Sequence, residues 1–256
     1  MSKDGATLYV ANVGTGTVSV FDTKTMAEVA TLPAGKGCHG VTLSPEGGEL
    51  WTANVGENTV TIIDTATRKQ IGKIDSMGKK PMLVAFSPDG RRAFVSNGGT
   101  ADVAVFDARS RKFLKSIFTG KAVMGIESSP DGKHVWVTEG GDRVVSVLGT
   151  EELEVVREVT LGKDPHGLTF GPGGTRLYIT NRLDNNLAII DAKRFKVLAK
   201  ISTSSKPDII ALSPDETEAY VTTRVSNVVD VIDLKKRKVV KSIRVGKDPH
   251  GIVIRP

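Results

Sequence analysis

The sequence predicts an all-β fold, a six-bladed β-propeller with four antiparallel strands in each blade. The first observation is a period of about 42 residues, visible in the five-residue segment KDPHG, which occurs at 163–167 and again at 247–251. The second is a turn proline that keeps this period, at Pro45, Pro88, Pro130, Pro172, Pro214 and Pro256. The third is that every repeat contains four short β-like runs. A repeat of this length with four strands is typical of a propeller blade.

The second repeat shows the four expected strands in order. They are HGVTLS (39–44), ELWTAN (49–54), TVTIID (59–64) and KQIGKID (69–75). All four are rich in β-branched or aromatic residues, and turn residues separate them. We name the strands A to D, from the channel outward.

The ends of the chain predict how the ring closes. The chain begins inside a repeat, and its last run, GIVIR (251–255), has the pattern of an inner strand. We therefore expect this run to pair with the first blade, whose other three strands lie in residues 8–32. This 3+1 closure would remove the exposed edges of an open array. The prediction is one domain over residues 1–256.

Composition excludes several classes of protein. Aromatic residues make up only 5% and the basic residues are spread over all repeats, which disfavours nucleic acid as a partner. No apolar run is long enough to cross a bilayer, and the first residues lack the apolar core of a signal peptide. The single cysteine, Cys38, excludes an internal disulfide. We expect a soluble monomer.

The repeat resembles the YVTN β-propeller family. The resemblance is carried by Tyr178-Ile179-Thr180-Asn181, Tyr9-Val10-Ala11-Asn12, the turn Ser87-Pro88-Asp89-Gly90 and the Gly-x-x-Pro-x-Gly segment at Gly162–Gly167. It covers the whole chain, although family members often have seven blades. Such repeats occur in surface-layer proteins, in exported propellers linked to quinoprotein catabolism and in cytochrome-d1-like proteins. The resemblance implies a periplasmic or cell-surface location, with the cytoplasm as the alternative.

Strand order places the D–A and B–C loops on one face, at the mouth of the channel. The position equivalent to the fourth residue of KDPHG is occupied in the six repeats, in chain order, by His39, Met82, Met124, His166, Asp208 and His250. His166, Asp208, His250 and His39 would lie on consecutive blades, an arrangement suited to a transition metal such as Cu, Zn or Fe, or to haem. Cys38 would add a thiolate. The alternative is that each histidine only bonds local backbone or water.

A second set of candidate binding residues lies at the end of strand B or directly after it. The strands end on Asn12, Asn54, Asn97 and Asn181, and on Glu139 and Thr223 in the other two repeats. Arg182 and Arg224 follow on neighbouring blades and suggest a fork for a carboxylate or phosphate. Glu127 lies inside an inner strand. Each of these has a structural alternative, since Asn bonds local backbone readily and repeats drift.

No catalytic motif has a readable spacing, so our leading prediction is a non-enzymatic scaffold that binds a protein or a small anionic ligand at the channel mouth. One alternative is a metal- or haem-associated redox or accessory propeller using His39, His166, Asp208 and His250. The other is a lactonase- or lyase-like enzyme, with Glu127, Glu139, Arg182 and His166 as acid–base candidates.

Overall fold

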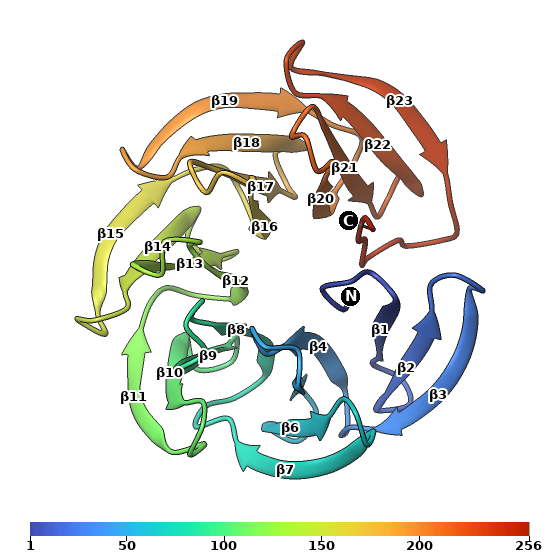
Figure 1. Ribbon diagram of the computed structural model, residues 1–256. Coiled ribbons are helices and arrows are strands. Elements are labelled where there is room, and N and C mark those ends of the chain that lie inside the picture. Colours follow the sequence, from blue (N-terminus) through green and yellow to red (C-terminus); the bar gives the residue numbers. More distant parts are fainter. Residues whose placement is uncertain (256) are drawn as a thin grey trace.

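The computed structural model describes residues 1–255 and shows six β-sheets arranged round a central channel (Figure 1). This confirms the predicted six-bladed propeller. Five sheets have four strands and the first has three. Pro256, the last of the periodic prolines, lies outside the described residues. No helix among the described residues is long and apolar enough to cross a membrane.

The strands follow the repeat through the chain. Blade 1 holds β1 (Thr7–Asn12), β2 (Thr17–Asp22) and β3 (Ala27–Pro33). Blade 2 holds β4 (Cys38–Leu43), β5 (Glu49–Asn54), β6 (Thr59–Asp64) and β7 (Lys69–Asp75). Blade 3 holds β8 (Pro81–Phe86), β9 (Arg92–Asn97), β10 (Asp102–Asp107) and β11 (Phe113–Phe118).

The second half of the ring repeats the pattern. Blade 4 holds β12 (Val123–Ser128), β13 (His134–Glu139), β14 (Val144–Gly149) and β15 (Val155–Thr160). Blade 5 holds β16 (Pro165–Phe170), β17 (Arg176–Asn181), β18 (Asn186–Asp191) and β19 (Lys196–Ser202). Blade 6 holds β20 (Pro207–Leu212), β21 (Glu218–Thr223), β22 (Val228–Asp233) and β23 (Lys238–Arg244).

The hydrophobic core lies between the blades, because the middle strands of each sheet are apolar on both faces. Five clusters of buried side chains each join two consecutive blades, from blade 1 with 2 to blade 5 with 6. Trp51, for example, packs edge-on against Phe86 of the next blade, and Trp136 packs in the same way against Phe170. Aromatic side chains at these boundaries bury large areas and hold the sheets face to face.

The predicted 3+1 closure is not formed in the described residues. Residues 251–255 belong to no strand, and β1 pairs only with β2. Figure 1 shows an opening between blades 6 and 1, with both chain ends toward its inner side. The physical reason is that no shared apolar cluster among residues 1–255 joins these two blades, so packing does not bring β1 against the final segment.

The expected assignment of loops to faces is confirmed. In several blades the backbone of the B–C loop donates to the D–A loop beside it, as from Arg182 N to Asp164 O at 2.9 Å and from Arg224 N to Lys206 O at 3.0 Å. At the other end the residue after strand C donates to the A–B turn, as from Ala192 N to Thr175 O at 3.0 Å. The D–A loops therefore surround one mouth of the channel.

Candidate functional site

A β-bulge at the start of each inner strand determines where the ring residues point. In blade 5 the pairing of β16 with β17 jumps from Pro165↔Asn181 to Leu168↔Ile179, and in blade 6 it jumps from Pro207 to Ile210. His166 and Asp208 lie inside these irregularities, and His39 lies inside the corresponding one in blade 2. A bulge releases its residues from the ladder and redirects a side chain. Here it allows the ring residues to reach the channel mouth.

The threonine of the Tyr-Val-Thr-Asn-like tetrad anchors this backbone across blades. Thr138 Oγ1 donates to the carbonyl of His166 at 2.7 Å, and Thr180 Oγ1 donates to that of Asp208 at 2.7 Å. Thr222 Oγ1 donates in the same way to the carbonyl of His250 at 2.8 Å. The three residues at the mouth are thus held by the three blades that have Thr at this position.

Steric contact with the next blade explains why glycine follows the ring residue in blades 4 and 5. A Cβ at Gly167 would lie 2.2 Å from the carbonyl oxygen of Asp208 on the next blade. A Cβ at Gly125 would lie 2.4 Å from the carbonyl oxygen of His166. At these two positions only glycine permits the close approach of the neighbouring inner strand, whereas Leu83 and Ile209 occupy the corresponding position in blades 3 and 6.

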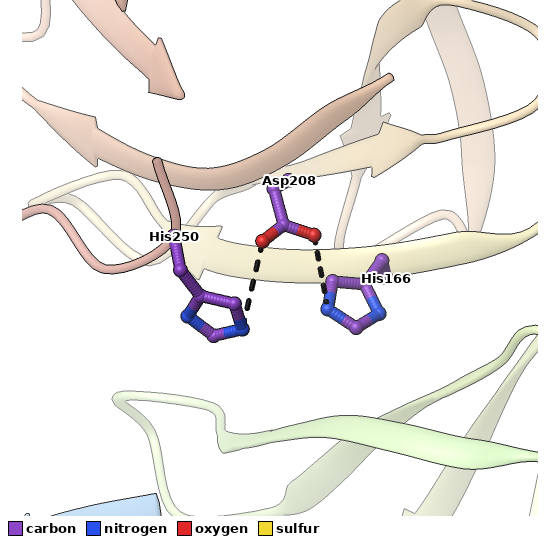
Figure 2. Close-up of side chains that lie close together, drawn as sticks. All are labelled: His166, Asp208 and His250. Carbon is purple, nitrogen blue, oxygen red and sulfur yellow. Dashed lines mark ion pairs between the residues drawn. The ribbon is translucent and has the colours of Figure 1, made fainter. Parts of the chain in front are cut away.

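His166, Asp208 and His250 form one cluster at the mouth (Figure 2). The two rings lie on either side of the carboxylate, each beside a different oxygen. His166 Nε2 is 3.2 Å from Asp208 Oδ1, and His250 Nε2 is 3.5 Å from Asp208 Oδ2. One ligand atom from each of the three residues lies within 4.8 Å of the others. The structure therefore brings together three of the four predicted metal ligands.

The cluster is buried and incompletely hydrogen-bonded. The Asp208 side chain is 0% exposed and that of His166 is 5% exposed, whereas His250 keeps 41% of its side-chain surface. Asp208 Oδ2 and His166 Nδ1 have no hydrogen-bond partner within the protein. Buried polar atoms without partners are uncommon in native proteins and call for a bound group or water. The exposed edge of His250 marks the side open to solvent.

Arg182 neutralises the buried carboxylate. Its Nε donates to Asp208 Oδ1 at 2.7 Å, and its Nη2 lies 2.5 Å from the same oxygen. Both contacts use Oδ1, which leaves Oδ2 available on the side of His250. Arg224 makes the corresponding contacts with Asp248 one blade further on. The two arginines are therefore paired with carboxylates of this chain. These pairs occupy the guanidinium groups that we predicted would bind a carboxylate or phosphate.

The electrostatic surroundings keep the histidines neutral. Burial and, to a smaller extent, the positive charge of Arg182 together lower the pKa of His166 to about 2. Burial also lowers the pKa values of His39 and His250 below the usual range, although Asp208 acts in the opposite direction on both. Neutral imidazole carries a free lone pair, which is the state that binds a metal.

His39 is next to the cluster but outside the group of three. Its ring packs edge-on against that of His250, with 5.5 Å between the ring centroids. Its Nδ1 lies 3.2 Å from the carbonyl oxygen of Met82, which orients the ring and leaves Nε2 as the second nitrogen. His39 therefore lies beside His250 at the mouth but outside the group of three whose ligand atoms lie within 4.8 Å of one another.

Cys38 does not contribute a thiolate, which corrects our expectation. The side chain is 0% exposed and packs in the core between blades 1 and 2. Burial raises the pKa of its thiol to about 11. Because side chains alternate along a strand, Cys38 points into the core while its neighbour His39 points to the mouth.

The asparagines that end strand B are bonded within the protein. Asn12 Nδ2 donates to Ser19 Oγ at 2.9 Å and Asn54 Nδ2 donates to Thr61 Oγ1 at 2.9 Å, each on the next strand of its own blade. Asn97 Nδ2 donates to the carbonyl of Ser76, and Asn181 Nδ2 to Asn186 Oδ1. These contacts support the structural alternative for this set, as ties between strand B and its surroundings.

The two candidate glutamates lie away from the cluster. Glu139 ends β13 and is 2% exposed; burial raises its pKa, and its Oε1 has no hydrogen-bond partner. Glu127 lies on inner strand β12, where Phe170 N donates to its Oε1 at 3.3 Å. Burial raises the pKa of Glu127 to about 7. Neither glutamate belongs to the group formed by His166, Asp208 and His250 in the described residues.

Sequence reasoning missed the Arg182–Asp208 pair and the anchoring threonines. A signal for both was present. The arginine follows strand B in two consecutive repeats. An aspartate follows each arginine near the next channel-mouth segment, 26 residues on at Asp208, in inner strand β20, and 24 residues on at Asp248, in the segment after β23. The third tetrad position is Thr only in the three blades that precede His166, Asp208 and His250.

Comparison with known proteins places the chain among β-propellers. Residues 1–196 match the family model described as "Lactonase, 7-bladed beta-propeller", and residues 169–255 match that of the YNCE-like beta-propeller. No curated protein sequence matches significantly. These matches support the propeller in the predicted resemblance, with a blade count of six where the lactonase description has seven.

Two solved structures share the fold at low sequence identity. Hydrazine synthase of Kuenenia stuttgartiensis superposes with a TM-score of 0.91 at 21% identity, over 100% of this chain and 88% of that one. A protein of unknown function from Desulfotomaculum acetoxidans superposes with a TM-score of 0.80 at 20% identity, over 97% of this chain and 81% of that one. At these identities the likeness concerns the fold alone. Because the lactonase model matches more than half of the sequence, the chain belongs to the seven-bladed β-propeller lactonase family.

Proposed function

We propose that this protein is a non-enzymatic binding propeller that holds its ligand at the channel mouth, on the face with the D–A and B–C loops. The observation that carries the proposal is the pair of buried polar atoms without partners, Asp208 Oδ2 and His166 Nδ1. Leaving such atoms unsatisfied costs about 1–3 kcal/mol each. A bound group at the mouth would satisfy them.

The construction of the mouth supports binding. Threonines of blades 4, 5 and 6 fix the backbone carbonyls of the three cluster residues. His166 and Asp208 project from strands β16 and β20, and His250 projects from the segment after β23. A preorganised site loses little conformational entropy when it binds. Exposed lysines surround the same mouth at Lys36, Lys79, Lys121, Lys163 and Lys247. Their charge favours a small anionic ligand, or a protein partner with an acidic surface.

A thermal-shift panel tests this function. The untagged protein is melted with divalent metals, small carboxylates, phosphates and sugar lactones, each over a range of concentrations. We expect at least one class to raise the Tm, because a ligand that binds only the folded state stabilises it. The rise should be lost in His166→Ala. The matched control is His134→Ala, whose ring packs on Phe195, away from the mouth. A panel without any shift, or a shift that persists in His166→Ala, would contradict the proposal.

Lactone hydrolysis is the second candidate function. It is favoured by the family to which the chain belongs and by Glu127, whose pKa of about 7 suits a general acid or base at neutral pH. Titration of the acid released from a set of sugar lactones measures this activity directly. We expect Glu127→Gln to abolish it, with the conservative Glu151→Gln at an exposed turn as control. Equal rates with and without protein would end this candidate.

The YVTN-like repeat also supports a proposed location and setting. Exported propellers of this kind suggest the periplasm or cell surface, and the cytochrome-d1-like members suggest association with a metal or haem. Fractionation of the source organism with an antibody to this protein tests the location. A Soret band in the protein purified from that organism would identify haem.

A further inference from the structure

We infer that His166, Asp208 and His250 bind one divalent transition-metal ion, Zn²⁺ or Cu²⁺, at the channel mouth. This inference rests on the proposed binding function and names the class of its ligand. The ligand atoms are Nε2 of each histidine and a carboxylate oxygen of Asp208. His39 lies beside the position left for a fourth ligand.

The distances between the ligand atoms fit a metal of this size. With metal–nitrogen and metal–oxygen bonds of 2.0–2.1 Å, two ligand atoms of a tetrahedral site are separated by about 3.3 Å. The two observed separations from the carboxylate are 3.2 Å, from His166 Nε2 to Oδ1, and 3.5 Å, from His250 Nε2 to Oδ2. These two separations involve different oxygens of Asp208, and one ligand atom from each of the three residues lies within 4.8 Å of the others, so a small movement of the rings would bring all three to one ion.

The type of ligand selects the ion. Two of the three donors are imidazole nitrogens, which suit Zn²⁺ and Cu²⁺, whereas Ca²⁺ and Mg²⁺ prefer oxygen ligands throughout. The sulfur of Cys38 lies in the core and takes no part.

The surroundings of the ligands resemble the outer shell of a metal site. Arg182 donates to Asp208 Oδ1 and fixes the carboxylate, while Oδ2 stays without a hydrogen-bond partner. The carbonyl of Met82 holds His39 Nδ1 at 3.2 Å, and this contact directs Nε2 away from the backbone. Such contacts orient ligands in metalloproteins. The charge of Arg182 opposes a cation, so we expect weaker binding than at a closed structural zinc site.

Calorimetric titration of the untagged, chelator-treated protein with Zn²⁺ tests the inference. We expect one ion per chain, and no measurable binding of Mg²⁺ at the same concentrations. His166→Ala and His250→Ala should each lower the affinity at least tenfold, and His39→Ala should lower it less. His134→Ala and Cys38→Ser are controls that should leave the affinity unchanged, because neither residue reaches the mouth.

A measurement on the unaltered protein keeps the test independent of variant folding. One equivalent of Cu²⁺ should give an electron paramagnetic resonance spectrum with hyperfine structure from two or three nitrogen ligands. Absence of binding by the wild-type protein, or Zn²⁺ affinity unchanged in both His166→Ala and His250→Ala, would overturn the inference. If carboxylates or phosphates still raise the Tm in a His166-dependent way, the proposed binding function survives without the metal. If no compound raises it, both are wrong.

Discussion

Replacing Arg182 by methionine should destabilise the protein strongly, because it leaves a buried carboxylate without a counter-charge. The Arg182 side chain is 11% exposed and its partner Asp208 is 0% exposed. Removing one member of a buried ion pair typically costs about 3–5 kcal/mol. Methionine is apolar and of similar length, so loss of packing adds little. For a chain of this size that free energy corresponds to a fall in Tm of roughly 6–20 °C.

The chain contains a matched control for this experiment. Arg224 pairs with Asp248 in the next blade through the same guanidinium atoms, but the side chains are 26% and 62% exposed. Exposed pairs contribute about 0–1 kcal/mol. Arg224→Met should therefore lower the Tm by only a few degrees. Scanning calorimetry of the two variants beside the wild type, at the same protein concentration and without added metal, gives the comparison.

The result that would refute the reasoning is an equal loss for the two variants, or a loss below about 1 kcal/mol for Arg182→Met. Either outcome would mean that water or a rearranged neighbour solvates Asp208 once the arginine is gone. The double variant with Asp208→Asn adds a second check. Without the charge on residue 208, the loss of Arg182 should cost much less, because no buried anion remains unpaired.

Three further predictions follow from other parts of the molecule. Burial raises the pKa of Glu127 from 4.5 to about 7, so between these pH values the folded protein keeps a proton that the unfolded chain has lost. The free energy of unfolding should therefore fall by up to about 3 kcal/mol as the pH rises from 4.5 through 7. Urea melts at a series of pH values measure this dependence, and Glu127→Gln should remove it. A thiol reagent should modify Cys38 slowly in the native protein and rapidly in guanidinium, because the thiol is 0% exposed and its pKa is about 11; rapid native modification would place it outside the core. The amide of Tyr9 should exchange with deuterium faster than that of Tyr178, because the register directs the Tyr9 amide to the side of β1 that has no partner strand among the described residues, whereas Tyr178 pairs with Thr169 on the inner strand of its blade. Equal protection of these two amides would indicate that the final segment pairs with β1 in solution.

Much of the site was predictable because a repeat turns positions in the sequence into positions round an axis. Residues 42 apart occupy equivalent places in neighbouring blades, so His166, Asp208 and His250 were expected as neighbours at one mouth, and the structure confirms this. The four-strand blade followed from the alternation of β-like runs and turns. These are local properties, repeated with a constant period, and local rules are sufficient for them.

Tertiary structure decided which atoms meet. The period places Cys38 and His39 side by side, but only the direction of the strand separates a core thiol from an imidazole at the mouth. The period also suggests free arginines, whereas the structure pairs Arg182 with Asp208 of the next blade. Ring closure depends on whether two sheets share an apolar interface, and the described residues of blades 6 and 1 do not. The sequence by itself determined the blades and their order, since these follow from local pattern. Side-chain partners and the seam between the first and last blades depend on distances across the ring, which only the folded chain defines.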